Sequence, residues 1–183
     1  MTDLIPMAAL GATPVRASFG PLTLTEEEGL TLVSLALPVG FDASVTEVPL
    51  PGPGGYAIGT TSVFWTGPNQ WMIETRDLDA TSRALAPLPD ARTTVQSDGW
   101  VSFRITSEAG AAPLLDLVTK LVNLPADQLA PGRATRTLLH HLGCFVLRRS
   151  ETEMAVLTLR SAAGSLWYVL SGAAARIAAQ EAT

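Results

Sequence analysis

Short apolar segments separated by Gly-, Pro- and Asn-containing turns run through most of the chain. Several of them have the length and the β-branched or aromatic content of strands. They cover residues 30–37, 56–65, 70–75, 91–96, 100–106, 136–149 and 154–160. Other segments repeat apolar residues at intervals of three and four, as amphipathic helices do. These cover residues 77–88, 109–124 and 161–179, so the pattern predicts a mixture of strands and helices.

The order of these segments predicts an α+β fold, with antiparallel sheets that carry helices on one face. Residues 1–28 are rich in Pro, Gly and Ala before an acidic run, and we expect them to form an irregular N-terminal arm. Residues 29–183 then make a single domain of two similar units, about 30–90 and 91–180. Within the second unit, segments 91–96 and 100–106 are expected to pair as a hairpin around a short turn at Ser97, Asp98 and Gly99.

The stretch from Phe64 to Glu74 is the clearest local signal in the chain. Pro68 presets the backbone for a turn corner and Asn69 tolerates the left-handed region, so Gly67–Asn69 is expected to be a tight turn between two strands. Trp65 and Trp71 flank this turn and are placed to pack across the ladder. On pattern alone, the hairpin is structural.

The composition is apolar and weakly charged, since 47% of residues are hydrophobic and only 16% are charged. The mean hydropathy is +0.27. Two explanations stay open: apolar surface that a partner covers, or an alanine-rich genome. The net charge of −5 lacks the basic footprint that nucleic-acid binding requires. Lys120 is the only lysine, so no lysine cluster offers a site for anionic lipid.

The N-terminus has no basic region ahead of an apolar one, so a secretory signal is not expected. The longest apolar run, over residues 30–39, is too short to span a bilayer. Cys144 is the single cysteine, which rules out an internal disulfide and is compatible with a reducing compartment. These features favour a cytoplasmic protein with no membrane attachment.

The candidate chemical groups do not form a catalytic or metal-binding pattern. His140 and His141 are adjacent on a predicted strand, so they should point to opposite faces, one in the core and one exposed. Ser97 and Asp98 have no histidine nearby in sequence and are read as a turn. Cys144 lies in an apolar run, where a thiol is usually inert. The glycine-rich loop at residues 49–55 lacks the residues of a phosphate-binding loop.

Four motifs, taken in order, resemble a known family. They are Trp65-Thr-Gly-Pro-Asn-Gln-Trp71, Gln96-Ser-Asp-Gly-Trp-Val101, Pro131-Gly-Arg-Ala-Thr-Arg-Thr137 and Leu159-Arg-Ser-Ala-Ala-Gly-Ser-Leu-Trp167. Together they resemble the gamma subunit of heterotetrameric sarcosine oxidase over roughly residues 30–175. The resemblance implies the folate-binding fold of the aminomethyltransferases, built from pseudo-duplicated, ferredoxin-like units.

The resemblance also implies a function. A sarcosine oxidase complex demethylates sarcosine to glycine with tetrahydrofolate and oxygen, and the gamma subunit would be a non-catalytic assembly subunit beside alpha, beta and delta subunits. FAD, FMN, NAD, tetrahydrofolate and zinc would then belong to those partners, and no cofactor to this chain. No segment matches the catalytic or folate-contacting motifs of the aminomethyltransferases, so no catalytic, cofactor-binding or metal-binding residue is assigned.

Two alternatives to an assembly subunit stay open. One is a free-standing tetrahydrofolate-dependent aminomethyl transferase, for which the chain is short. The other is a small-ligand sensor built on the same fold.

Arg133 and Arg136 are the candidate partner contacts. They flank the start of a predicted strand, and guanidinium groups suit carboxylates at interfaces. Local salt bridges on a solvated face are the alternative role for both.

Overall fold

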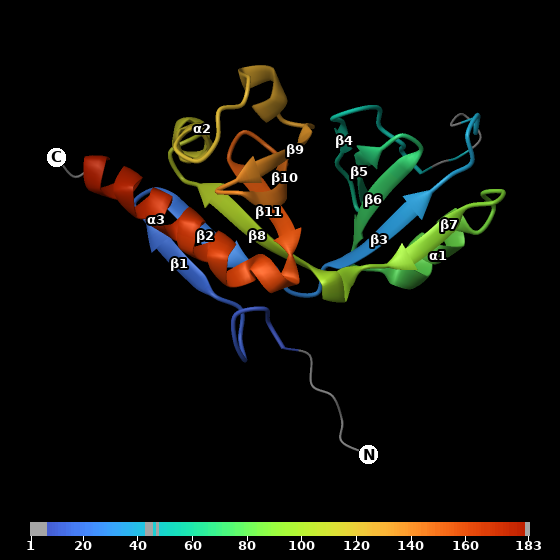
Figure 1. Cartoon of the computed structure of the whole chain (residues 1–183), viewed down its shortest axis with the longest axis horizontal. Helices are drawn as coiled ribbons and strands as arrows, with labels where there is room; N and C mark the ends of the chain where they lie inside the picture. The colour runs from blue at the N-terminus through green and yellow to red at the C-terminus, as the bar shows by residue number, and fades with distance from the viewer. Residues whose placement is uncertain (1–6, 43–45, 47, 182–183) are drawn as a thin grey trace, which may run out of the picture.

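The computed structural model describes residues 7–42, 46 and 48–181, which fold into two antiparallel sheets and three α-helices (Figure 1). The predicted α+β class is therefore confirmed. The six-stranded sheet contains β1 (Arg16–Phe19), β2 (Leu22–Glu26), β8 (Trp100–Ser107), β9 (Ala134–Leu139), β10 (Leu142–Arg148) and β11 (Glu153–Leu159). The five-stranded sheet contains β3 (Thr31–Ala36), β4 (Tyr56–Ala57), β5 (Ser62–Gly67), β6 (Gln70–Thr75) and β7 (Arg92–Val95). The helices are α1 (Leu78–Leu85), α2 (Ala112–Thr119) and α3 (Ala163–Glu181), with short 3-10 turns η2 (Ser97–Gly99), η3 (Ala126–Leu129) and η4 (Arg160–Ala162).

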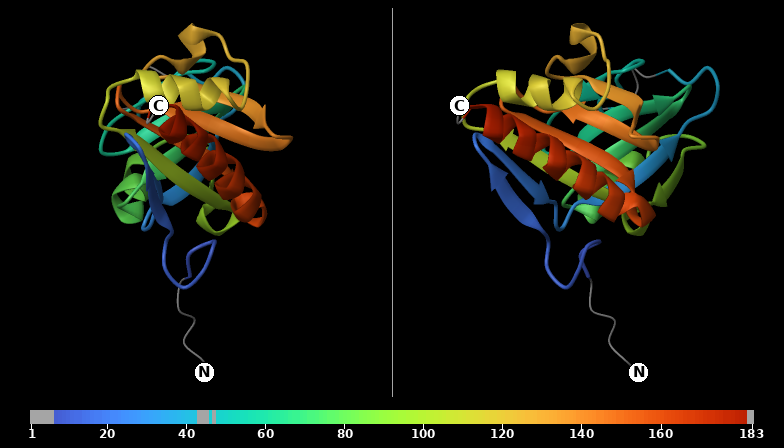
Figure 2. Two further views of the ribbon diagram at one scale, coloured as in Figure 1. Left: turned by 90° about the vertical axis from the view of Figure 1, so that its left-hand side faces the viewer. Right: turned by 60° about the vertical axis from the view of Figure 1, so that its left-hand side comes forward.

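Each sheet has a helix-covered outer face and an inner face that looks toward the other sheet. Figure 2 shows α2 and α3 lying over the six-stranded sheet, and α1 packs on the five-stranded one. The alternation of side chains along β3 illustrates the division. Val33 and Leu35 point to the α1 side, while Leu32 joins Phe64 and Phe145 in an apolar cluster between the sheets. The protein is therefore layered as helix, sheet, sheet and helix.

The two sheets repeat one topology. Neighbouring strands follow the order β4-β5-β6-β3-β7 in one sheet and β9-β10-β11-β8-β2 in the other. In both, a first strand (β3 or β8) is followed by a three-strand meander and then by a helix (α1 or α3). The position that β7 fills in the five-stranded sheet is filled by β2 in the six-stranded sheet. An N-terminal strand thus completes the C-terminal unit.

The prediction of an irregular arm over residues 1–28 is wrong for residues 16–26, which form β1 and β2. β2 pairs with β8, so that Leu24 stands opposite Ile105, and Leu22 and Leu24 are fully buried. The alternation Leu-Thr-Leu-Thr has the period of a strand, but it is only one strand long and follows the Gly20–Pro21 turn. Residues 1–6 of the predicted arm lie outside the described residues.

The predicted hairpin of residues 91–96 and 100–106 is also wrong. β7 pairs with β3 and β8 pairs with β2 and β11, so the two segments belong to different sheets. The intervening Ser97–Gly99 forms the 3-10 turn η2, which carries the chain from one sheet to the other. A short polar turn is compatible with either connection, and only tertiary pairing decides between them.

The predicted strand over residues 136–149 is instead the hairpin of β9 and β10. His140 and His141 form its turn, with φ of 45° and 70°. Two consecutive left-handed residues suit the twist of a two-residue hairpin loop. Both histidines are exposed, so the expectation that one lies in the core is wrong.

Other predicted elements are confirmed with adjusted ends. The side chain of Asp77 caps α1 by accepting a hydrogen bond from the Ala80 amide at 2.8 Å. The hairpin of β5 and β6 turns at Asn69, with φ of 55°, and places Trp65 opposite Trp71. Trp71 is half-buried and its Nε1 donates to the Pro51 carbonyl at 2.8 Å, which fastens the 49–55 loop onto the sheet.

Candidate functional site: a buried arginine between the sheets

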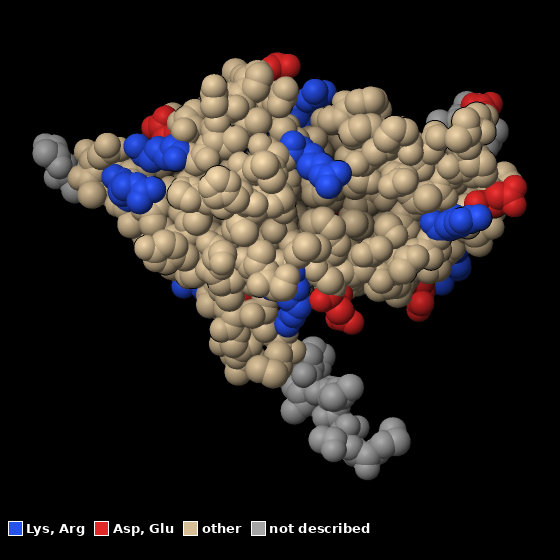
Figure 3. Space-filling view, in the orientation of Figure 1, with Lys and Arg blue, Asp and Glu red and all other residues tan. Residues whose placement is uncertain are grey.

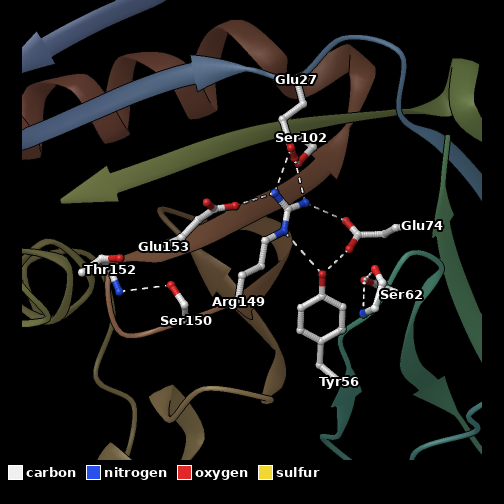
Figure 4. Close-up of polar contacts among 10 residues, drawn as sticks. Glu27, Tyr56, Ser62, Glu74, Ser102, Arg149, Ser150, Thr152 and Glu153 are labelled. Carbon is white, nitrogen blue, oxygen red and sulfur yellow. Dashed lines mark hydrogen bonds and ion pairs between the residues drawn. The ribbon is translucent and has the colours of Figure 1, made fainter. Parts of the chain in front are cut away.

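Arg149 occupies the space between the two sheets because of its position just after β10. Along β10, Cys144 and Val146 face the helices, and the next residue in that alternation, Arg148, is buried on that side. The alternate residues Phe145 and Leu147 face the other sheet. Arg149 continues this second set, so its guanidinium reaches across the gap toward β4 and β6 (Figure 4).

The guanidinium of Arg149 is held by three carboxylates. Its Nη1 and Nη2 donate to the two oxygens of Glu27 at 2.8 and 2.9 Å, which is the bidentate geometry. Nη2 also donates to Glu74 at 3.1 Å, and Nη1 to Glu153 at 3.3 Å. Because Glu27 and Glu153 belong to the six-stranded side and Glu74 to β6, the arginine is bonded to both sheets.

Two hydroxyl groups complete the cluster. Ser102 on β8 donates to Glu27 at 2.5 Å. The Tyr56 hydroxyl on β4 donates to Glu74 and lies 3.4 Å from Nε of Arg149, from which it accepts. The strands β4, β6, β8 and β11, together with the residues that follow β2 and β10, therefore contribute polar groups to one connected network, as Figure 4 shows.

The pKa values of the two carboxyl groups closest to Arg149, Glu27 and Glu74, are shifted in opposite directions. Burial tends to raise the pKa of Glu27, but the hydrogen bonds and charge of Arg149 outweigh it and the pKa is lowered. Burial raises the pKa of Glu74, and the attraction of Arg149 does not cancel it. Glu27 accepts both arms of the arginine fork, whereas Glu74 accepts one hydrogen bond from Arg149. The pKa of the Tyr56 hydroxyl is raised by burial and by the neighbouring Glu74.

The network borders a surface hollow of about 370 Å³. Its polar wall comes from Glu74, Arg149 and Glu153, and Ile58 and Leu30 add apolar surface. The donors of Arg149 already point at the chain's own oxygen atoms, so the guanidinium needs no ligand to be satisfied. The arrangement is able to fasten the two sheets together, with the Tyr56 hydroxyl donating a hydrogen bond to Glu74.

The structure separates the two predicted partner contacts. Arg133 is half-buried at a place where the chain segments of the two sheets meet. The residues on each side of it are hydrogen-bonded across this contact: the Ala134 amide donates to the Gly54 carbonyl at 3.0 Å, and the Gly132 carbonyl accepts from the Tyr56 amide at 2.8 Å. Gly54 has a φ of +67°, and a Cβ there would stand 3.1 Å from Nη2 of Arg133. Arg136 is exposed on β9, with its guanidinium carbon 5.8 Å from the centre of the Phe145 ring. A role for either arginine in partner binding stays a prediction.

The other candidate residues do not converge. His140 and His141 lie in the β9–β10 turn, and Ser97 Oγ accepts a hydrogen bond from the Leu32 amide at 3.1 Å. Cys144 is buried, and burial raises the pKa of its thiol. Among the described residues, no group of three or more His, Cys, Asp or Glu side chains is arranged to hold a metal ion. No helix in the described part of the chain is long and apolar enough to cross a membrane.

Comparison with solved structures places this architecture among known folds. A chain of heterotetrameric sarcosine oxidase from Corynebacterium sp. U-96, solved in complex with pyrrole 2-carboxylate, superposes with a TM-score of 0.71. It is 22% identical, and the match covers 88% of this chain and 88% of that one. The two chains share a fold. The resemblance seen in the sequence is thus confirmed at the level of architecture.

A second solved structure has the same architecture over part of its length. Glycine cleavage system aminomethyltransferase T from Bartonella henselae is 14% identical, with a TM-score of 0.55. The match covers 86% of this chain but only 50% of the transferase. No protein-family model and no curated protein matches the sequence.

Sequence reasoning missed the buried network entirely. Glu27, Glu74 and Arg149 are far apart in the chain, and no local spacing joins them. A usable signal was present at the ends of two strands, because Glu74 and Arg148–Arg149 directly follow apolar runs. A charged residue in such a run is either at a strand end or buried with a partner.

Proposed function

We propose that this chain is the gamma-type, non-catalytic assembly subunit of a multi-subunit sarcosine oxidase, working in the cytoplasm. The complex would convert sarcosine to glycine with tetrahydrofolate and oxygen. The observation that carries the proposal is the reciprocal match with a chain of heterotetrameric sarcosine oxidase, which covers 88% of both chains. A match of this kind fits a whole subunit, whereas the transferase match leaves half of that protein without a counterpart.

The polar network supports an assembly role. Arg149 is bonded to Glu27, Glu74 and Glu153 of the same chain, so it stabilises the contact between the sheets without a substrate. FAD, FMN, NAD, tetrahydrofolate and zinc would be held by the alpha, beta and delta partners. Charged residues are few and scattered on the face shown in Figure 3, as a surface that packs against larger subunits requires.

The alternative is a free-standing tetrahydrofolate-dependent aminomethyl transferase. One observation favours it: the buried Glu74 carboxyl, with its raised pKa, lies at the wall of a hollow of about 370 Å³. A ligand bound in this hollow could contact the Glu74 carboxyl group.

Co-expression with the alpha, beta and delta subunits tests the proposal. The chain should co-purify in stoichiometric amount, and a preparation made without it should lose assembly and sarcosine oxidation together. Arg136→Ala, compared with Arg16→Ala on the exposed side of β1, tests the predicted partner contact. Failure of the wild-type chain to co-purify would contradict the assembly role and leave the fold assignment intact.

A further inference from the structure

In the part of the chain that the structure describes, no strand lies beside the outer edge of β7. β7 is the last strand of the five-stranded sheet, and the strand it pairs with there is β3. All four of its residues are exposed, and Val95 retains 53% of its accessible surface. The strand is short and begins with the charged Arg92, but it has no proline and no register shift, and its remaining residues, Thr93 to Val95, carry no charge.

The backbone of β7 presents free hydrogen-bonding groups at this edge. The Gln96 amide donates to the Leu32 carbonyl at 2.7 Å, and ladder bonds recur at every second residue. Thr94 and Arg92 therefore turn their amides toward β3, whereas Thr93 and Val95 turn theirs outward. An extended segment lying beside β7 would find two N–H and two C=O groups in the geometry of a ladder.

A groove of about 240 Å³ runs between β7 and α1. Thr93 and Val95 share the α1 side of the sheet, because their partners Leu35 and Val33 belong to the cluster beneath α1. Leu78 on α1 also lines the groove and is 36% exposed. Apolar side chains on alternate residues of an added strand would be buried there.

The repeated topology indicates what occupies this edge. In the six-stranded sheet, the strand equivalent to β7 is β2, and β2 is covered by the antiparallel strand β1. Alternate residues of β1, Ala17 and Phe19, are partly buried, and β1 contacts α3, the counterpart of α1. The five-stranded sheet has no strand in this place among the described residues.

We propose that β7 and the α1 groove accept an extended strand from another subunit of the complex. The strand would add antiparallel to β7, in the place that β1 has beside β2, with alternating apolar side chains, one of them aromatic, against α1. The identity of the partner rests on the proposed function, whereas the open edge and the groove belong to this chain alone.

Hydrogen exchange in the assembled complex is the direct test. The Thr93 and Val95 amides should exchange quickly in the isolated chain and at least about tenfold more slowly in the complex with alpha, beta and delta subunits. Val95→Lys places a charge in the groove without removing a buried group, and should lower recovery of the complex about tenfold or more. Leu159→Lys, at a position that is 54% exposed, is the matched control and should assemble normally. Thr93→Pro removes one outward N–H while leaving the ladder to β3 intact, and should act like Val95→Lys.

Three other results would contradict the strand-acceptor proposal. Normal assembly of Val95→Lys and Thr93→Pro, with unchanged exchange at β7, would overturn the strand-acceptor role and leave the assembly function standing. Failure of the wild-type chain to assemble would overturn both proposals. A homodimer of the isolated chain that Val95→Lys dissociates would show that a second copy occupies the edge, which contradicts the proposed partner.

Discussion

At the scale of single residues, the contact between the two sheets depends on Arg149. Its guanidinium is mostly buried, and its charge is balanced by Glu27 and Glu74, whose side chains are only 7% and 4% exposed. Burying these charges is costly, and the cost is recovered only while every partner is in place. The network therefore fixes the relative position of the sheets, since a small shift of either one would leave a charge unpaired.

Replacing Arg149 by methionine should destabilise the protein by about 3–5 kcal/mol, because it leaves buried carboxylates without their cation. The free energy of unfolding from denaturant titration measures this loss. Arg136→Met is the control; Arg136 is exposed and its contact with Phe145 is worth about 1 kcal/mol or less. Equal losses for the two variants would contradict the role assigned to Arg149.

The pH dependence of stability should carry opposite contributions from Glu27 and Glu74. The folded pKa of Glu27 is lowered, so its contribution is present above the unfolded pKa and is lost as the pH falls through the folded value. The folded pKa of Glu74 is raised, so its contribution is full below the unfolded pKa and is lost as the pH rises through the folded value.

Glu74→Gln should therefore remove a decline in stability that the wild type shows above the ordinary pKa of a glutamate. Glutamine keeps the shape and a hydrogen bond but does not titrate. Denaturant midpoints measured from acid to neutral pH test this, with Glu151→Gln, whose side chain is 73% exposed, as the control. Parallel curves for the wild type and Glu74→Gln would rule out a raised pKa at Glu74.

At the scale of elements, the sequence predicted what local periodicity determines. The turn at Asn69 and the helices expected over residues 77–88 and 161–179 follow from short-range rules. The pairing of strands does not follow from such rules. Whether Ser97–Gly99 closes a hairpin or crosses between sheets depends on which edges are free elsewhere, and no local pattern holds that information. The buried network escaped prediction for the same reason, since it exists only after β6 and β10 face each other.

The place of β2 inside the six-stranded sheet can be tested through Leu24. Leu24→Ala should cost about 2–5 kcal/mol, the usual loss for a fully buried leucine, because β2 is an inner strand and not part of an irregular arm. Leu138→Ala on β9, at a position that is 63% exposed, should change stability little. Thermal or denaturant unfolding compares the two, and a small effect at Leu24 would argue against the pairing of β2 with β8.

At the scale of the whole molecule, the protein is two similar units that meet through an apolar cluster and one polar network. The apolar part includes Phe64, Phe145 and Leu157, and the polar part is centred on Arg149. Together they hold the two sheets against each other, and the polar part borders the hollow of about 370 Å³.

Tetrahydrofolate should bind the isolated chain weakly or not at all, with a dissociation constant weaker than about 1 μM. The reason is that Arg149 is already satisfied by the chain's own carboxylates. Isothermal titration calorimetry with tetrahydrofolate measures the affinity, and Glu74→Gln is the matched variant. Tight binding to the wild type that is lost in Glu74→Gln would favour the transferase alternative.

The placement of β2 has a consequence for the order in which the chain is made. On the ribosome, β1 and β2 emerge first, yet β8, the strand that β2 requires, emerges only after β3 to β7 are complete. The five-stranded sheet can form while the N-terminal strands wait without a partner, and their Leu22 and Leu24 remain in water until synthesis reaches Ser107. During that interval the β8 edge of a neighbouring nascent chain competes for the same strand. Crowded translation would therefore favour exchange of β1 and β2 between molecules, giving intertwined dimers in which the pairing of β2 with β8 is kept.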